Sequence, residues 1–155
     1  MRLEEEISQP NFKSEHQKML INIMYTSGWL HNIIAHNLKN YDITPQQFNI
    51  LRILRGQYPN TARMHLLQER MLDKMSNASR LVERLRYKGL VKRKICIKDR
   101  RAVDVVITEQ GLQLLKQLDV AESKWQEQFK TIDDTAARNL NELLDNLRGN
   151  TNLNH

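Results

Sequence analysis

The chain has 155 residues, 40% of them hydrophobic and 27% charged, which is the composition of a soluble globular protein with a real core. Its formal charge is +6, and residues 84–101 alone carry nine Lys or Arg and one acidic residue. This concentration favours a protein that binds a nucleic-acid groove over a generally adhesive basic protein. The single Cys96 excludes an internal disulfide framework, and neither a secretory signal nor a membrane-spanning run is visible, so we expect a cytoplasmic protein without a membrane partner.

The first part of the chain is expected to be helical. Residues 1–12 are expected to be frayed, and apolar residues at three- and four-residue spacing then predict one amphipathic helix over about 14–41. Residues 44–47 (Thr-Pro-Gln-Gln) predict the start of the next helix, because Thr44 can cap it and Gln47 can complete a capping box.

A helix-turn-helix is predicted next. A short helix is expected over roughly 63–71, followed by a tight break and a second helix from about Lys74 to Lys88. Asp73 is the expected cap of that second helix, and Gly89 is its expected C-terminal stop.

A hairpin and two further helices complete the predicted order. After Gly89 the spacing at which apolar residues recur changes from 3.6 residues, typical of a helix, to 2 residues, typical of a strand. This change predicts a strand from residue 91, a polar tip at 98–101 and a return strand over about 103–107. Thr108 is expected to cap a helix over about 109–130, and Asp133 to open the last one.

The expected fold class is mainly α with a small β-hairpin. A winged helix-turn-helix DNA-binding domain is predicted at 42–108, and a helical dimerisation region at 14–41 and 109–149. The apolar faces of the flanking helices exceed what a small winged domain can cover, which favours packing across a two-fold axis. Closure of these helices into a monomeric bundle is the alternative.

The predicted recognition helix carries short polar side chains and arginines at the end that would enter the major groove. Asn77 could pair with adenine and Arg80 with guanine or a phosphate, because these pairings match the groove's donor and acceptor pattern. The predicted DNA-binding residues on this helix are Ser76, Asn77, Ser79, Arg80 and Arg84. The alternative is that Ser76 and Asn77 are ordinary first-turn residues of a helix.

The hairpin tip is the second predicted DNA contact. Arg100 and Arg101 could enter the minor groove, and Asp99 could hold Arg101 extended by a charge-assisted hydrogen bond. A solvated charged turn is the alternative for this tip. The nearby lysines are expected to contact phosphates and to carry little sequence information, namely Lys88, Lys92, Lys94 and Lys98.

At this point the sequence resembles the MarR family of bacterial transcriptional regulators. The matching segments are Ser79-Arg80-Leu81-Val82-Glu83-Arg84-Leu85, Lys88-Gly89-Leu90-Val91, Asp99-Arg100-Arg101, Thr108-Glu109-Gln110-Gly111 and Thr44-Pro45-Gln46-Gln47-Phe48. The resemblance implies a homodimer that binds double-stranded DNA at a pseudo-palindromic site, usually as a repressor. It also implies a small ligand, often aromatic, between the dimer helices and the DNA-binding lobe, for which Met24, Trp29 and His31 are the candidate residues.

Other functions have little support in the residues. The five glycines are scattered, so no phosphate-binding loop is present, and neither a nucleophile elbow nor an evident carboxylate pair predicts an enzyme. The histidines lack metal-ligand spacing, so neither a metal nor a cofactor is expected. Cys96 is interpreted as an exposed strand residue, with a redox-active thiolate as the alternative. The alternative function is a winged-helix protein-interaction or architectural module with non-specific nucleic-acid binding.

Overall fold

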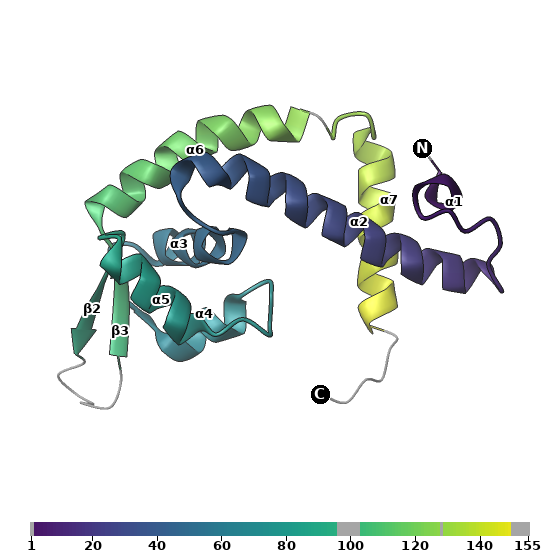
Figure 1. Ribbon diagram of the computed structural model, residues 1–155. Coiled ribbons are helices and arrows are strands. Elements are labelled where there is room, and N and C mark those ends of the chain that lie inside the picture. The colour runs from purple at the N-terminus through teal and green to yellow at the C-terminus, as the bar shows by residue number, and fades with distance from the viewer. Residues whose placement is uncertain (1, 96–102, 128, 150–155) are drawn as a thin grey trace. The chain divides into compact units, whose positions relative to one another are not determined.

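The computed structural model describes residues 2–95, 103–127 and 129–149. Contacts divide the chain into two compact units, Met1–Leu114 and Leu115–His155. The first unit holds most of the helices and the sheet (Figure 1). The expected fold class, mainly α with a small antiparallel sheet in a winged-helix arrangement, is confirmed.

The N-terminal segment contains a short helix, contrary to the prediction of a frayed segment. Helix α1 (Leu3–Glu6) buries Leu3. Glu4 forms an ion pair with Lys18 at 2.5 Å, and the Tyr25 hydroxyl donates to the Glu6 carboxylate at 2.8 Å. These contacts join α1 to helix α2, and they were missed because they depend on residues 14 and 19 positions apart in the chain.

Helix α2 (Glu15–Leu38) begins where the sequence predicts, with the Ser14 side chain accepting the Gln17 N–H. Although the helix is amphipathic in sequence, Leu38 is its only buried residue in the described structure. A 3₁₀ turn, η1 (Lys39–Tyr41), follows, and Asp42 then adopts the left-handed conformation at φ 52°. The α2 surface therefore carries apolar side chains that this single chain leaves exposed.

Helix α3 (Pro45–Gln57) is the centre of the first unit's core. Thr44 and Gln47 form the predicted capping box, with the Thr44 hydroxyl accepting the Gln47 N–H at 3.2 Å and the Gln47 side chain accepting the Thr44 N–H at 3.1 Å. Its apolar side chains Phe48, Ile50, Leu51 and Leu54 are buried.

The helix-turn-helix consists of α4 (Met64–Arg70) and α5 (Ala78–Tyr87). The predicted start of the second helix near Lys74 is wrong, because residues 71–77 form a non-helical turn and Asn77, not Asp73, is the cap. The predicted stop at Gly89 is confirmed, since this residue has φ 73° and ends the helix in the left-handed conformation that glycine favours.

Three short antiparallel strands lie in the order β1-β3-β2. Strand β2 (Val91–Ile95) pairs with β3 (Val103–Ile107) along its whole length, and β1 (Ala62–Arg63) pairs with the other side of β3. Strand β1 was not predicted, because two residues are too few to show an alternating pattern. The two longer strands project as a hairpin, or wing, beside α5 (Figure 1).

The start of helix α6 (Glu109–Glu127) is fixed to the winged lobe. Thr108 caps it as predicted, accepting the Gly111 N–H at 3.1 Å, and donates its hydroxyl proton to the Gly89 carbonyl at 2.7 Å. A Cβ on Gly111 would lie 2.4 Å from the Leu90 carbonyl oxygen, so only glycine permits this approach.

The second unit contains the rest of α6 and helix α7 (Asp134–Gly149). As predicted, Asp133 caps α7, accepting the Thr135 and Ala136 N–H groups. Leu115 and Leu118 of α6 are buried, whereas α7 buries none of its residues. None of the described helices is long and apolar enough to cross a lipid bilayer.

Candidate nucleic-acid interface

The turn that precedes α5 is held by two side chains. Gln68 of α4 donates to the carbonyls of Lys74 and Ser76 and accepts the Ala78 N–H at 3.2 Å. Asp73 accepts the Ser76 hydroxyl proton at 2.7 Å and the Met75 N–H at 3.0 Å. These bonds, with the Ser76 hydroxyl as the larger cause, lower the pKa of the Asp73 carboxyl below its ordinary value. The turn therefore has a defined backbone path into α5.

Asn77 and Ser76 are engaged in local structure. The Asn77 side-chain oxygen accepts the Arg80 N–H at 3.0 Å as the cap of α5. A bidentate pairing with adenine needs both that oxygen and the amide nitrogen, so it would compete with the cap. The hypothesis that Asn77 contacts a base is therefore restricted to its amide N–H₂ group as long as the cap is intact.

The remaining predicted residues of α5 lie on its exposed side. Ala78, Val82 and Leu85 face the core and are buried, while Ser79, Arg80 and Arg84 are exposed. This division follows from the helical period, since the buried residues recur at four- and three-residue intervals. The helix thus presents a hydroxyl group and two guanidinium groups to solvent.

Glu83 joins α5 to the wing. Its carboxylate forms an ion pair with Arg93 of β2 at 2.6 Å and another with Arg86 of α5 at 3.2 Å. The second contact raises the pKa of the Arg86 guanidinium. Arg93 and Arg86 thus have an acidic partner within the protein, whereas Lys92 and Lys94 on the same strand are exposed.

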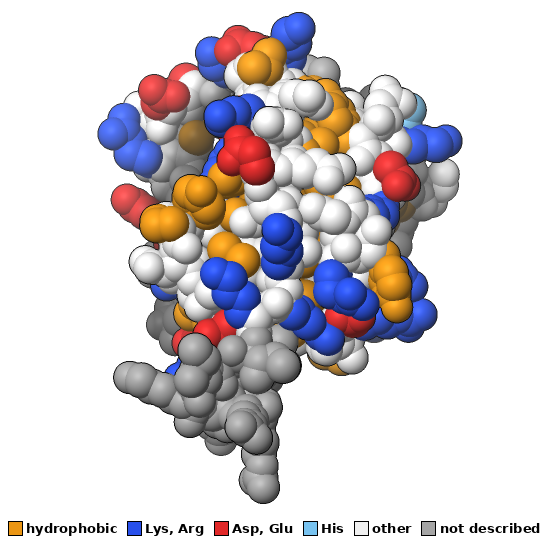
Figure 2. Space-filling view, turned by 90° about the vertical axis from the view of Figure 1, so that its left-hand side faces the viewer, with side chains coloured by type: hydrophobic (Ala, Val, Ile, Leu, Met, Phe, Trp, Pro, Cys, Tyr) orange, Lys and Arg blue, Asp and Glu red, His pale blue; other side chains and the backbone are white. Residues whose placement is uncertain are grey.

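The wing contributes basic side chains near α5. Figure 2 shows several Lys and Arg side chains close together on one face of the molecule. The predicted tip residues Lys98, Asp99, Arg100 and Arg101, together with Cys96, lie outside the described residues. Their proposed roles at the DNA therefore rest on the sequence.

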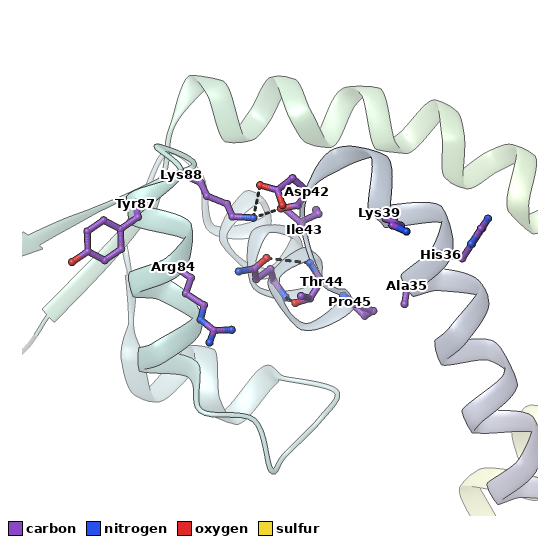
Figure 3. A pocket seen from close by; sticks show the side chains of 11 residues that line it. Ala35, His36, Lys39, Asp42, Ile43, Thr44, Pro45, Arg84, Tyr87 and Lys88 are labelled. Carbon is purple, nitrogen blue, oxygen red and sulfur yellow. Dashed lines mark hydrogen bonds and ion pairs between the residues drawn. The ribbon is translucent and has the colours of Figure 1, made fainter.

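A groove of about 740 Å³ lies beside the C-terminal half of α5. It is lined by the end of α2, by the connection to α3 and by one side of α5 (Figure 3), that is, by Ala35, His36, Lys39, Asp42, Ile43, Thr44, Pro45, Gln47, Arg84, Tyr87 and Lys88. The Lys88 ammonium group forms an ion pair with the Asp42 carboxylate at 2.9 Å and also donates to the Asp42 carbonyl. Lys88, predicted to contact phosphate, is therefore paired within the protein.

The predicted ligand residues lie elsewhere. Met24, Trp29 and His31 are all on α2, N-terminal to the part of this helix that lines the groove, and Met24 is 75% exposed. Sequence reasoning missed Asp42, whose place in the left-handed turn after η1 has no periodic signature. The ion pairs of Glu83 were not predicted either, although Glu83 and Arg86 carry opposite charges at a helical i, i+3 spacing.

The family model for the MarR family matches residues 43–103, which span α3, the helix-turn-helix and the start of the wing. Residues 43–103 are a MarR-family domain. The resemblance seen in the sequence is thereby confirmed. No curated protein sequence matches the chain.

Solved structures extend the similarity beyond the MarR-family domain to the flanking helices. A MarR-like transcription regulator from Bacillus cereus ATCC 10987 has a TM-score of 0.78 at 24% identity, covering 89% of this chain and 99% of that one. A MarR transcription factor from Planctomyces limnophilus has a TM-score of 0.66 at 28% identity, covering 89% and 98%. S. aureus MepR, solved as a DNA complex, has a TM-score of 0.73 at 16% identity, covering 91% and 100%. The chain thus has the fold of a MarR-family transcriptional regulator.

Proposed function

We propose that the chain is a sequence-specific regulator of transcription that binds double-stranded DNA, acting as a repressor. The observation that carries this proposal is the exposed face of α5, with Ser79, Arg80 and Arg84 at the end of a fixed turn and beside a basic wing. A helix of this kind enters the major groove while a basic ribbon follows the backbone. The DNA complex of S. aureus MepR supports it, because that protein shares the fold. Binding to DNA would place the protein in the cytoplasm.

We further propose that the active form is a homodimer on a pseudo-palindromic site. The support is the apolar surface on the helices that flank the MarR-family domain: Leu20 and Met24 of α2, and Leu140 and Leu143 of α7, are exposed. Apolar side chains at helical spacing along two helices are expected to be buried by a second copy. On this proposal residues 14–41 and 109–149 dimerise and residues 42–108 bind DNA.

The experiment that tests both proposals is an in vitro selection of duplexes from a random library with the full-length chain, followed by light scattering of the free protein. A palindromic consensus and a dimer mass are the expected results, with affinity that falls steeply as salt rises. Equal affinity for the selected and a scrambled duplex would favour the alternative, a protein-interaction or architectural module. Leu143→Asp should shift the mass towards the monomer, and Glu142→Lys on the same helix is the control.

We also propose that a small aromatic anion binds in the groove beside α5 and releases DNA. Lys39 and Arg84 supply positive charge there, Tyr87 supplies an aromatic ring, and Lys88 is paired with Asp42. The groove volume of about 740 Å³ lies within the range of small-molecule sites. A regulator bound to 2,4-dichlorophenol has the same fold. Calorimetry with benzoate and 2,4-dichlorophenol tests this proposal. The absence of binding heat for both ligands, with no release of DNA, would contradict it. This regulator is not expected to be an enzyme.

A further inference from the structure

The turn between α4 and α5 exposes an unusual side chain. Met75 is 94% exposed, more than any other large hydrophobic side chain in the described part of the chain, and Leu72 in the same turn is 86% exposed. Met75 stands two residues before Asn77, the cap of the recognition helix. A large apolar side chain is therefore exposed to solvent next to the residues expected to contact DNA.

The backbone that carries Met75 is fixed. Its N–H donates to Asp73 at 3.0 Å, and the flanking carbonyls of Lys74 and Ser76 accept from Gln68 at 3.2 and 3.0 Å. Because the turn is already ordered, the only conformational freedom lost on binding through this side chain is that of its own rotamers. An exposed loop without such bonds would first have to be ordered.

The polar groups at the same end of the helix are already engaged. The Ser76 hydroxyl donates to Asp73, and the Asn77 side-chain oxygen accepts the Arg80 N–H. A base contact that preserves these bonds can therefore use the apolar Met75 side chain. The apolar group that the major groove offers is the 5-methyl group of thymine.

The charge around the turn favours DNA over a protein partner. Residues 70–88 contain six basic and two acidic residues, and both arginines that flank the exposed side of α5, Arg80 and Arg84, face solvent. The basic residues around this apolar side chain are complementary to a groove bordered by phosphates. We propose that Met75 is a specificity-determining residue that contacts a thymine methyl group in the major groove, an inference that rests on the proposed function.

The test uses the full-length chain and the duplex enriched by in vitro selection, in which each thymine is replaced in turn by deoxyuridine. Loss of the contacted methyl should weaken wild-type binding about fourfold, as expected for one buried methyl group. Met75→Ala should bind the all-thymine duplex about fourfold more weakly and should lose the response to deoxyuridine at that position. Met75→Leu should retain the response, and Leu72→Ala, a matched exposed truncation in the same turn, should behave as wild type.

The outcomes distinguish a failure of the Met75 contact from a failure of the proposed sequence-specific DNA binding. If Met75→Ala responds to deoxyuridine at every position as the wild type does, Met75 does not contact a thymine methyl, while the regulator function stands. If the selection enriches no duplex, the proposed function itself is overturned. Equal unfolding temperatures for wild type and Met75→Ala are expected because the side chain is exposed, and a fall in the variant would contradict its assignment to DNA contact alone.

Discussion

Glu83 of the recognition helix and Arg93 of the first wing strand lie 2.6 Å apart and form the ion pair that connects the two expected DNA-contacting elements. The pair is partly exposed, so its direct contribution to folding stability is small, about 0.2–1 kcal/mol. Its consequence is geometric, because it fixes the strand that leads into the wing tip against the helix that would occupy the major groove.

Replacing Glu83 with Gln should therefore weaken DNA binding several-fold while changing the unfolding free energy by less than about 1 kcal/mol. Removal of a negative charge would by itself strengthen binding to DNA, so a loss of affinity isolates the positioning effect. Fluorescence anisotropy with the selected duplex measures the affinity, and Glu142→Gln on α7 is the matched control. The double variant with Glu83→Arg and Arg93→Glu should recover part of the loss; tighter binding by Glu83→Gln would show that the ion pair has no positioning role.

Arg80→Ala should lower affinity and reduce the salt dependence of binding. If Arg80 neutralises one phosphate, the slope of log K against log salt should fall by about 0.9. A base contact would instead give a loss that differs between the selected and a scrambled duplex. Arg138→Ala, an exposed arginine on α7, is the control, and an affinity equal to wild type for Arg80→Ala would remove this residue from the interface.

Asn77 allows capping and base contact to be separated. Asn77→Ala removes both the cap oxygen and the amide and should cost about 1 kcal/mol of folding stability. Asn77→Ser keeps a capping oxygen, so it should retain most of the stability while losing the amide donor. Denaturant unfolding measures the first effect and repeated selection measures the second. An unchanged consensus for Asn77→Ser would leave Asn77 with a structural role only.

The Asp73 carboxyl provides a probe of the turn. Its pKa is lowered first by the Ser76 hydroxyl and then by the Met75 N–H, so the charged form is favoured in the folded state. The stabilisation of the folded state by the charged Asp73 carboxylate is therefore present above the unfolded pKa and is lost as pH falls through the lower folded pKa. NMR titration should show that Ser76→Ala moves the Asp73 pKa up towards its ordinary value. No movement would mean that the hydroxyl is not the main cause.

Several local features were predicted from the sequence because their partners are close in the chain. The Thr44–Gln47 capping box, the caps at Thr108 and Asp133 and the left-handed stop at Gly89 each depend on residues within a few positions. The buried faces of α3 and α5 follow the helical period for the same reason. The resemblance to the MarR family likewise came from short segments, which lie between Thr44 and Gly111.

What the sequence by itself determined is thus the order of the longer helices and of the two hairpin strands, most of their ends and the class of the fold. Tertiary structure decided where α5 begins, because Gln68 and Asp73 use their side chains to hold residues 74–77 out of the helix that their propensity allows. It also decided which basic residues are engaged, since Glu83 meets Arg93 and Asp42 meets Lys88 only after the chain has folded. Charge can be counted along a sequence, but its availability to DNA depends on which carboxylate the fold brings within reach of it.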